Sequence, residues 1–298
     1  MRVANAPCSW GVLEFESTAN TPAPDRVLDE IAATGYEGAE LGDWGFLGTD
    51  PGQLQRDLNR RRLALAGAFV AVALTDRSAH EAGEAAAVRT ARLLAGAGGG
   101  SAVIVLSDAT AAVPSRTARA GRITRADCLS DAAWDVVASG AGRIADAVRA
   151  ASGLRTVFHH HCATYVETPE EIDALMERTD PALVGLCLDT GHATYGGGDP
   201  GAILARYTGR VRHVHFKDCS RQVAAAARTE GWDYVRAVRN GLFCELGQGQ
   251  VDFSAILAQL RHAGYDGWIV VEQDVLPSMG TPAASAERNR QYLRALGV

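Results

Sequence analysis

The chain of 298 residues is long enough for one large domain, and its 47% hydrophobic and 21% charged residues are ordinary for a globular protein with a sizeable core. The net charge of −6 and the lack of a basic stripe disfavour a nucleic-acid partner. The N-terminus lacks the charged and apolar regions of a secretory signal, and no apolar run reaches transmembrane length. We therefore expect a single domain over residues 1–298 in the cytoplasm, without a membrane partner.

The cysteines are spread along the chain without any CxxC spacing. Most stand in or beside apolar runs, and a chain of this length without a secretory signal favours free buried thiols over disulfides. We expect free thiols at Cys8, Cys128, Cys162, Cys187, Cys219 and Cys244.

Short apolar or β-branched runs alternate with longer amphipathic segments along the chain. The short runs predict strands over residues 2–8, 37–41, 64–72, 102–107, 154–160, 183–189, 211–217 and 267–273. The longer segments predict helices over residues 24–35, 51–62, 78–97, 124–152, 169–178, 199–207, 251–264 and 283–296. Eight strands, each followed by a helix, predict a (β/α)8 barrel, the TIM barrel of the α/β class.

A doubly wound open sheet is the main alternative fold. It would carry a glycine-rich phosphate loop after the first strand, but the sequence there is Pro7-Cys8-Ser9-Trp10-Gly11. The glycine-rich stretch 96–100 precedes a strand and is typical of a helix terminus. After strand seven, residues 218–250 form an insertion with its own helical pattern at 220–239. We expect this insertion on the active-site face of the barrel.

Six of the eight histidines fall between residues 159 and 215, at the ends of three predicted strands. Alternation along strand five places His159 and His161 on one face, toward the barrel mouth, and His160 on the other, toward the helices. Strand six is an apolar run that closes on Asp189. A carboxylate at the top of such a run must be paired, hydrogen-bonded or bound to metal.

Strand seven places His213, His215 and Lys217 on one face, and strand eight closes on Glu272. Four consecutive strands therefore offer imidazole, carboxylate, imidazole and carboxylate at one level. We predict one divalent metal ion on Asp189, His215 and Glu272, with His159 as the fourth ligand. Mixed nitrogen and oxygen ligands suit Mn²⁺ or Co²⁺, our first choices, as well as Zn²⁺ and Fe²⁺, with Mg²⁺ also open, better than Ca²⁺.

Further residues are candidates for proton transfer or for substrate contact. Lys217 is placed to donate to a substrate oxygen or to form an ion pair with Asp218 or Glu272. The candidate acid and base groups are His161, His192 and Glu272, with the two roles unassigned. Candidate substrate contacts are Trp10 and Glu40 at predicted strand ends, Lys217, and Glu245 in the insertion. His213 is expected to pack one layer lower, His192 to orient a ligand or touch substrate, and His80 and His262 to face solvent from helices.

At these motifs the chain resembles the xylose-isomerase-like barrel superfamily, which includes sugar isomerases, ketose epimerases and inosose dehydratases. The resemblance rests on Leu188-Asp189-Thr190-Gly191-His192, His213-Val214-His215-Phe216-Lys217-Asp218 and Val271-Glu272. It looks closest to the inosose (2-keto-myo-inositol) dehydratase group, through stretches 6–12, 159–164, 237–244 and 264–274. The superfamily usually carries a glutamate, catalytic in the epimerases, where this chain has His159, and this departure argues against epimerisation.

The favoured hypothesis is a metal-dependent lyase that dehydrates a cyclic polyhydroxy ketone such as 2-keto-myo-inositol through an enolate. The alternative is a ketose isomerase or epimerase that uses the same metal-enolate chemistry. A DNA repair nuclease would need several metal ions and a basic face, and a sugar-binding barrel without activity would not need the ligand cluster. The expected partner is a small polyol or keto-sugar, and the resemblance implies a possible homo-oligomer.

Overall fold

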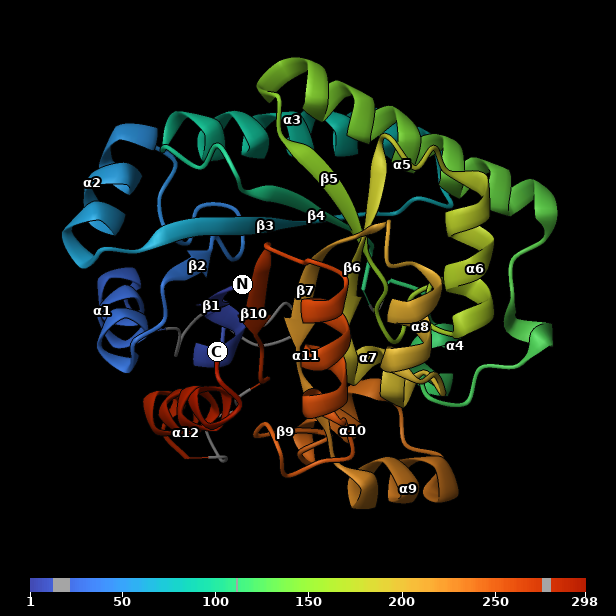
Figure 1. Ribbon diagram of the computed structural model, residues 1–298. Coiled ribbons are helices and arrows are strands. Elements are labelled where there is room, and N and C mark those ends of the chain that lie inside the picture. The colour runs from blue at the N-terminus through green and yellow to red at the C-terminus, as the bar shows by residue number, and fades with distance from the viewer. Residues whose placement is uncertain (13–21, 111, 275–279) are drawn as a thin grey trace.

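A computed structural model describes residues 1–12, 22–110, 112–274 and 280–298. Eight parallel strands close into a barrel in the order β1-β10-β7-β6-β5-β4-β3-β2, and the helices lie around its outside (Figure 1). This closed barrel confirms the (β/α)8 prediction. Its strands are β1 Arg2–Asn5, β2 Gly38–Glu40, β3 Ala64–Val72, β4 Val103–Asp108, β5 Arg155–His159, β6 Val184–Asp189, β7 Val211–Phe216 and β10 Trp268–Val271.

The helices follow the strands as the periodicity predicts, with proline and capping residues at many of their first turns. Thr168 opens α6 with a capping box to Glu171, and Asp199 caps α8. The α-helices are α1 Pro24–Thr34, α2 Pro51–Arg61, α3 His80–Gly96, α4 Pro114–Arg119, α5 Asp131–Ser152, α6 Pro169–Arg178, α7 Thr190–Tyr195, α8 Pro200–Arg206, α9 Arg221–Glu230, α10 Tyr234–Arg239, α11 Phe253–His262 and α12 Pro282–Ala295.

Three predictions about elements and their surfaces were wrong. The helix expected over 124–152 begins only at Asp131, because Ser130 caps it, and the short helix α4 precedes it. The strand expected over 2–8 ends at Asn5, because Pro7 opens a 3-10 turn over Pro7–Trp10. His80 is buried instead of solvent-facing, and its Nε2 lies 2.8 Å from the carbonyl oxygen of Leu74.

Small residues form a buried cluster with Trp268 and Val270 inside the barrel, while the larger apolar side chains pack between the barrel and its helices. Ala4, Ala6 and Ala66 belong to this inner cluster. Since the inner layers are narrow, polar side chains at the strand ends can reach one another across the barrel mouth.

Residues 218–250 form their own small unit between β7 and α11. Strand β8 (Asp218–Cys219) pairs antiparallel with β9 (Phe243–Cys244), and α9 and α10 lie between them in sequence. The Asp218 carboxylate accepts hydrogen bonds from the backbone N–H groups of Gly247 and Gly249, each at 2.9 Å. One buried carboxylate thus fixes the returning loop against β7.

No helix in the described part of the chain is both long and apolar enough to cross a membrane.

Candidate metal centre and active site

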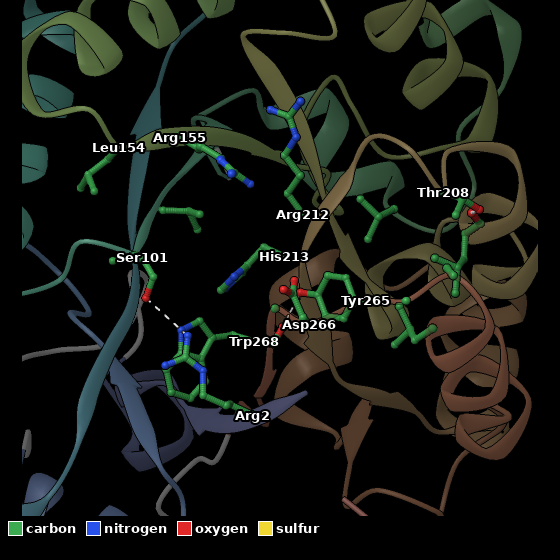
Figure 2. Close-up of a pocket in the computed structure, with 18 of the residues that line it drawn as sticks. Arg2, Ser101, Leu154, Arg155, Thr208, Arg212, His213, Tyr265, Asp266 and Trp268 are labelled. Carbon is green, nitrogen blue, oxygen red and sulfur yellow. Dashed lines mark hydrogen bonds between the residues drawn. The ribbon is translucent and has the colours of Figure 1, made fainter.

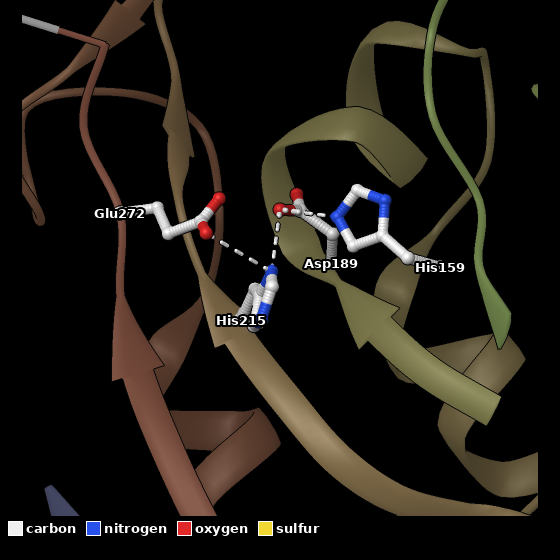
Figure 3. A group of neighbouring side chains, drawn as sticks. All are labelled: His159, Asp189, His215 and Glu272. Atoms are coloured by element: carbon white, nitrogen blue, oxygen red, sulfur yellow. Dashed lines mark ion pairs between the residues drawn. The ribbon is translucent and has the colours of Figure 1, made fainter. Parts of the chain in front are cut away.

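The four predicted ligands meet at the carboxyl ends of β5, β6, β7 and β10. His159, Asp189 and His215 lie within those strands, and Glu272 directly follows β10. One possible ligand atom from each residue lies within 4.8 Å of the other three, and all four side chains are buried. Figure 3 shows them pointing toward one common point. The parallel register of β6 and β7 places Asp189 opposite His215. For this reason the alternation of side chains along the two strands could predict that these residues lie side by side.

Distances within this group suit ligands of one ion better than a closed hydrogen-bonded network. Asp189 Oδ2 lies 3.5 Å from His159 Nε2 and 3.8 Å from His215 Nδ1. His215 Nδ1 lies 3.4 Å from Glu272 Oε1. Asp189 Oδ2 and His215 Nδ1 are buried and have no hydrogen-bond partner among the residues that the structure describes. Buried polar atoms are rarely left without a partner, so a pair of them aimed at one point indicates a missing cation.

The chemistry of the donor set also fits a divalent metal ion. Two imidazoles and two carboxylates supply the mixed nitrogen and oxygen ligands that Mn²⁺, Co²⁺, Fe²⁺ and Zn²⁺ accept. Burial would raise the pKa of Glu272, but the nearby charges of His215 and Lys217 hold it well below its usual value. The carboxylate therefore stays ionised and available as a ligand.

A cavity of about 90 Å³ opens beside this group at the mouth of the barrel. The candidate ligands His159, His215 and Glu272 line it, and Asp189 lies behind them. Its other charged or polar lining residues are Glu40, Asp43, Thr110, His161, Lys217, Tyr234 and Asp274.

Lys217 lies at the wall of this cavity and is almost completely buried. Its Nζ is 3.2 Å from both Glu272 Oε2 and Asp274 Oδ1. Burial would lower its pKa, but the charges of Asp274 and Glu272 outweigh that effect and raise the pKa well above its usual value. The ion pair with Glu272, one of the alternatives from the sequence, is present, and the ammonium also lines the cavity, while donation to a substrate oxygen stays a prediction.

The rings of His161 and His192 lie with their centroids 3.8 Å apart, tilted by 39° to each other, and of the two only His161 lines the cavity. His161 Nδ1 lies 2.6 Å from the carbonyl oxygen of Cys162, so this nitrogen carries the proton and Nε2 is left as the acceptor. Burial lowers the pKa of His161 well below its usual value. His192 is fully buried, and its Nδ1 accepts from the Cys162 N–H at 3.3 Å. His192 therefore packs against the ring of His161, and it is not among the residues that line the cavity.

Two expected substrate contacts lie away from the cavity. Trp10 is buried in the turn after β1, and its Nε1–H donates to Glu30 of α1 at 2.6 Å. Glu245 accepts from Arg288 and Ser285 of α12, so it ties the segment after β9 to that helix. Neither residue is among those that line the cavity, so the structure does not bring Trp10 or Glu245 to the candidate active site.

Further residues of the site have contacts that the sequence did not indicate. Glu40 lines the cavity as expected, but its Oε1 also accepts from His213 and His215. His160 faces away from the mouth, and its Nε2 accepts from the Asp189 N–H at 3.2 Å. Asp274 and Tyr234 were not singled out. The two-residue spacing from Glu272 could have indicated Asp274, whereas Tyr234 depends on how the insertion folds.

A larger cavity, of about 560 Å³, lies at the opposite end of the barrel (Figure 2). Arg2, Arg155 and Arg212 line it, and Arg2 stacks on the ring of Trp268 at 4.0 Å. His213 reaches it from above, but none of the four candidate metal ligands does. Because barrel enzymes build their chemistry at the carboxyl ends of the strands, the smaller cavity is the candidate active site.

The closed parallel barrel with buried nitrogen and oxygen ligands at its mouth defines an α/β barrel with a candidate divalent-metal centre. The xylose isomerase-like TIM barrel family model matches residues 28–296, and the chain belongs to that family.

The curated relatives and solved structures agree with this family. An inosose dehydratase of Geobacillus kaustophilus (strain HTA426) is 36% identical over 296 residues, which cover 99% of this chain and 94% of the relative. An inosose dehydratase of Lacticaseibacillus casei is 33% identical and covers 97% of this chain and 95% of its own length. Among solved structures, an L-ribulose 3-epimerase has a TM-score of 0.71 at 17% identity, covering 99% of this chain and 94% of its own. This last likeness concerns the fold alone.

Proposed function

We propose that the protein is a metal-dependent hydro-lyase that removes water from a cyclic polyhydroxy ketone of the 2-keto-myo-inositol type. The observation that carries this proposal is the likeness, over nearly the full length of both chains, to curated relatives named inosose dehydratase. The candidate metal centre, Lys217 and His161 support it, since they border one cavity at the barrel mouth.

The proposed reaction is a β-elimination. A carbon next to the ketone loses a proton, and the hydroxyl on the following carbon leaves with a proton as water. A divalent ion held by His159, Asp189, His215 and Glu272, with Mn²⁺ or Co²⁺ proposed first, would stabilise the negative charge that develops on the ketone oxygen.

His161 is the proposed base, because its Nδ1 is held by the Cys162 carbonyl and its ring lines the cavity. The Lys217 ammonium is the proposed donor to a substrate oxygen, since its ion pairs with Glu272 and Asp274 hold it beside the metal ligands. His192 packs against the ring of His161 from behind.

The direct test incubates chelator-treated protein with 2-keto-myo-inositol and with one added metal at a time, followed by mass analysis of the product. We expect a product lighter by one water molecule, with activity restored by Mn²⁺ or Co²⁺. His161→Gln is expected to lose roughly 10²- to 10⁴-fold in kcat, the usual contribution of one acid or base, while it retains its metal.

A product of unchanged mass would overturn the proposal. If ketoses were interconverted instead, the chemistry would be that of an isomerase or epimerase. Both activities begin with loss of a proton next to the ketone. The same panel separates them, because only dehydration lowers the mass of the product.

A further inference from the structure

Glu40 lies at the end of β2, on the side of the barrel mouth opposite Asp189, and its carboxylate is 3% exposed. One oxygen, Oε1, lies 2.7 Å from His213 Nε2 and 3.1 Å from His215 Nε2. Gly67 on the neighbouring strand β3 makes room for it, since a Cβ there would lie 3.2 Å from Oε1. The carboxylate is thus enclosed by strand β3 and two imidazoles of strand β7.

These contacts determine which nitrogen of His215 can bind a metal. An ionised carboxylate only accepts hydrogen bonds, so both imidazoles must donate to it from Nε2. A histidine that binds a metal does so as a neutral ring, and with the Nε2 proton held by Glu40 the lone pair of His215 would then be on Nδ1. This is the atom that lies 3.4 Å from Glu272 Oε1 and has no hydrogen-bond partner. The geometry therefore aims the lone pair at the candidate metal position.

His213 holds the carboxylate from below. Its ring lines the cavity at the other end of the barrel, and its Nε2 makes the shorter of the two bonds to Glu40. With two donors on one oxygen, the carboxylate is fixed in place. This arrangement matches the general rule that metal-binding histidines give their second nitrogen to a carboxylate or carbonyl, which sets the tautomer and the ring orientation.

A second metal ion on Glu40, His213 and His215 is the competing explanation, because these three residues also form a group of possible ligands. The 2.7 Å separation of Glu40 Oε1 and His213 Nε2 is a hydrogen-bond length. The unpartnered atoms also lie elsewhere, since they include Asp189 Oδ2 and His215 Nδ1 but no atom of Glu40 or His213. These contacts favour a hydrogen-bonded support over a second ion.

We infer that Glu40 is a positioning residue that holds His215 with its Nδ1 lone pair on the metal ion, with His213 as the support of Glu40. This inference rests on the metal centre of the proposed function, and it replaces the substrate contact expected from the sequence.

The test compares Glu40→Ala and Glu40→Gln with Asp43→Asn in the otherwise intact chain. Asp43 lines the same cavity three positions further on, and its removal takes away the same charge, but it makes no contact with His213 or His215 among the hydrogen bonds of the described residues. Mn²⁺ affinity is measured by competition with a fluorescent chelator. We expect Glu40→Ala to bind roughly 10- to 100-fold more weakly, the usual effect of losing such a partner, and Asp43→Asn to bind as the wild type does.

Nitrogen-15 NMR of the histidine rings in Zn²⁺-loaded protein gives a second readout that a loss of packing alone would not change. The wild type should show His215 protonated on Nε2 and coordinated through Nδ1, and Glu40→Ala should lose this single pattern. Glu40→Gln keeps the side-chain volume and one acceptor oxygen, so it provides the comparison if Glu40→Ala does not fold, and it should show an intermediate loss of affinity.

The possible failures are distinguishable. If the wild type binds no divalent metal, the proposed metal centre itself is wrong. If the wild type binds metal and both Glu40 variants bind it equally well, only the role of Glu40 is refuted. Two equivalents of metal in the wild type and one in Glu40→Ala would show a second metal site at Glu40 and overturn the inference.

Discussion

Asp189 allows the metal centre to be separated from the local fold, because its two oxygens have different partners. Oδ1 accepts the backbone N–H of His192 at 2.8 Å and so caps helix α7. Oδ2 has no hydrogen-bond partner and faces His159 and His215. Asn is as good an N-cap as Asp, whereas Ala is a poor one. Asp189→Asn should therefore remove only the metal ligand, and Asp189→Ala should remove both the ligand and the cap.

The expected magnitudes follow from these two losses. Without metal, Asp189→Ala should unfold at a lower temperature than Asp189→Asn, because loss of a cap costs about 1 kcal/mol, or ~2 °C in Tm for a chain of this size. With Mn²⁺ at about 100 times its Kd, the wild type should gain about 2.7 kcal/mol, or ~5 °C. Neither variant should show this gain.

Thermal unfolding in excess chelator and in excess Mn²⁺, combined with metal analysis of the purified proteins, measures both effects. If Mn²⁺ raises the Tm of Asp189→Asn as much as that of the wild type, Asp189 is not a ligand. If the two variants have equal Tm values in chelator, the capping argument is wrong, even if the metal result stands.

Three further predictions concern residues around the site. Alanine at Gly191 would place a Cβ 2.7 Å from Lys217 Cγ, so Gly191→Ala should displace that side chain and lower kcat with metal content unchanged, as measured by steady-state kinetics and metal analysis. Burial raises the pKa of Glu167 from 4.5 to about 7, so the native state binds the carboxyl proton more tightly than the unfolded chain does. The stability that this bound proton provides is lost as the pH rises through 7. Urea unfolding of the wild type should accordingly lose about 3 kcal/mol relative to Glu167→Gln between about pH 5 and pH 8. Arg116 and Glu171 form a buried ion pair at 2.7 Å, and Arg116→Met should cost about 3–5 kcal/mol in unfolding free energy because it leaves the carboxylate without its partner.

Alternation along regular strands is what made most of the site predictable. His159, Asp189 and His215 lie within strands, so a period of two fixed their common face, and the carboxyl ends of parallel strands meet at the same rim. The position of Trp10 could not be predicted in this way, because β1 ends at Asn5 and strand alternation does not apply in the turn that follows.

The surroundings of His80 and Glu245 depend on contacts between segments that lie far apart in the chain. His80 is buried because Gly140 of α5 leaves room for its ring, and a Cβ at that glycine would come within 2.6 Å of it. Glu245 accepts hydrogen bonds from Arg288, 43 residues later. The local sequence around His80 does not indicate Gly140, because that contact depends on how α3 packs against α5. The local sequence around Glu245 does not indicate Arg288, because that contact depends on how the insertion packs against α12.

The balance of buried charge at the barrel mouth explains why the ligands and Lys217 form one unit. Glu40, Asp189, Glu272 and Asp274 are all buried there, and among the described residues that line the cavity Lys217 is the only lysine or arginine. A buried carboxylate without a partner costs several kcal/mol, so one ammonium cannot compensate four of them. Burial raises the pKa of Asp274, and a divalent cation on Asp189 and Glu272 would balance part of the remaining charge. The same cation would weaken the hold of Glu272 on Lys217 and leave its ammonium free to turn toward a substrate oxygen. On this reasoning, metal binding prepares the lysine as well as the ligands, and substrate should bind more weakly to the metal-free protein even through groups that never touch the metal.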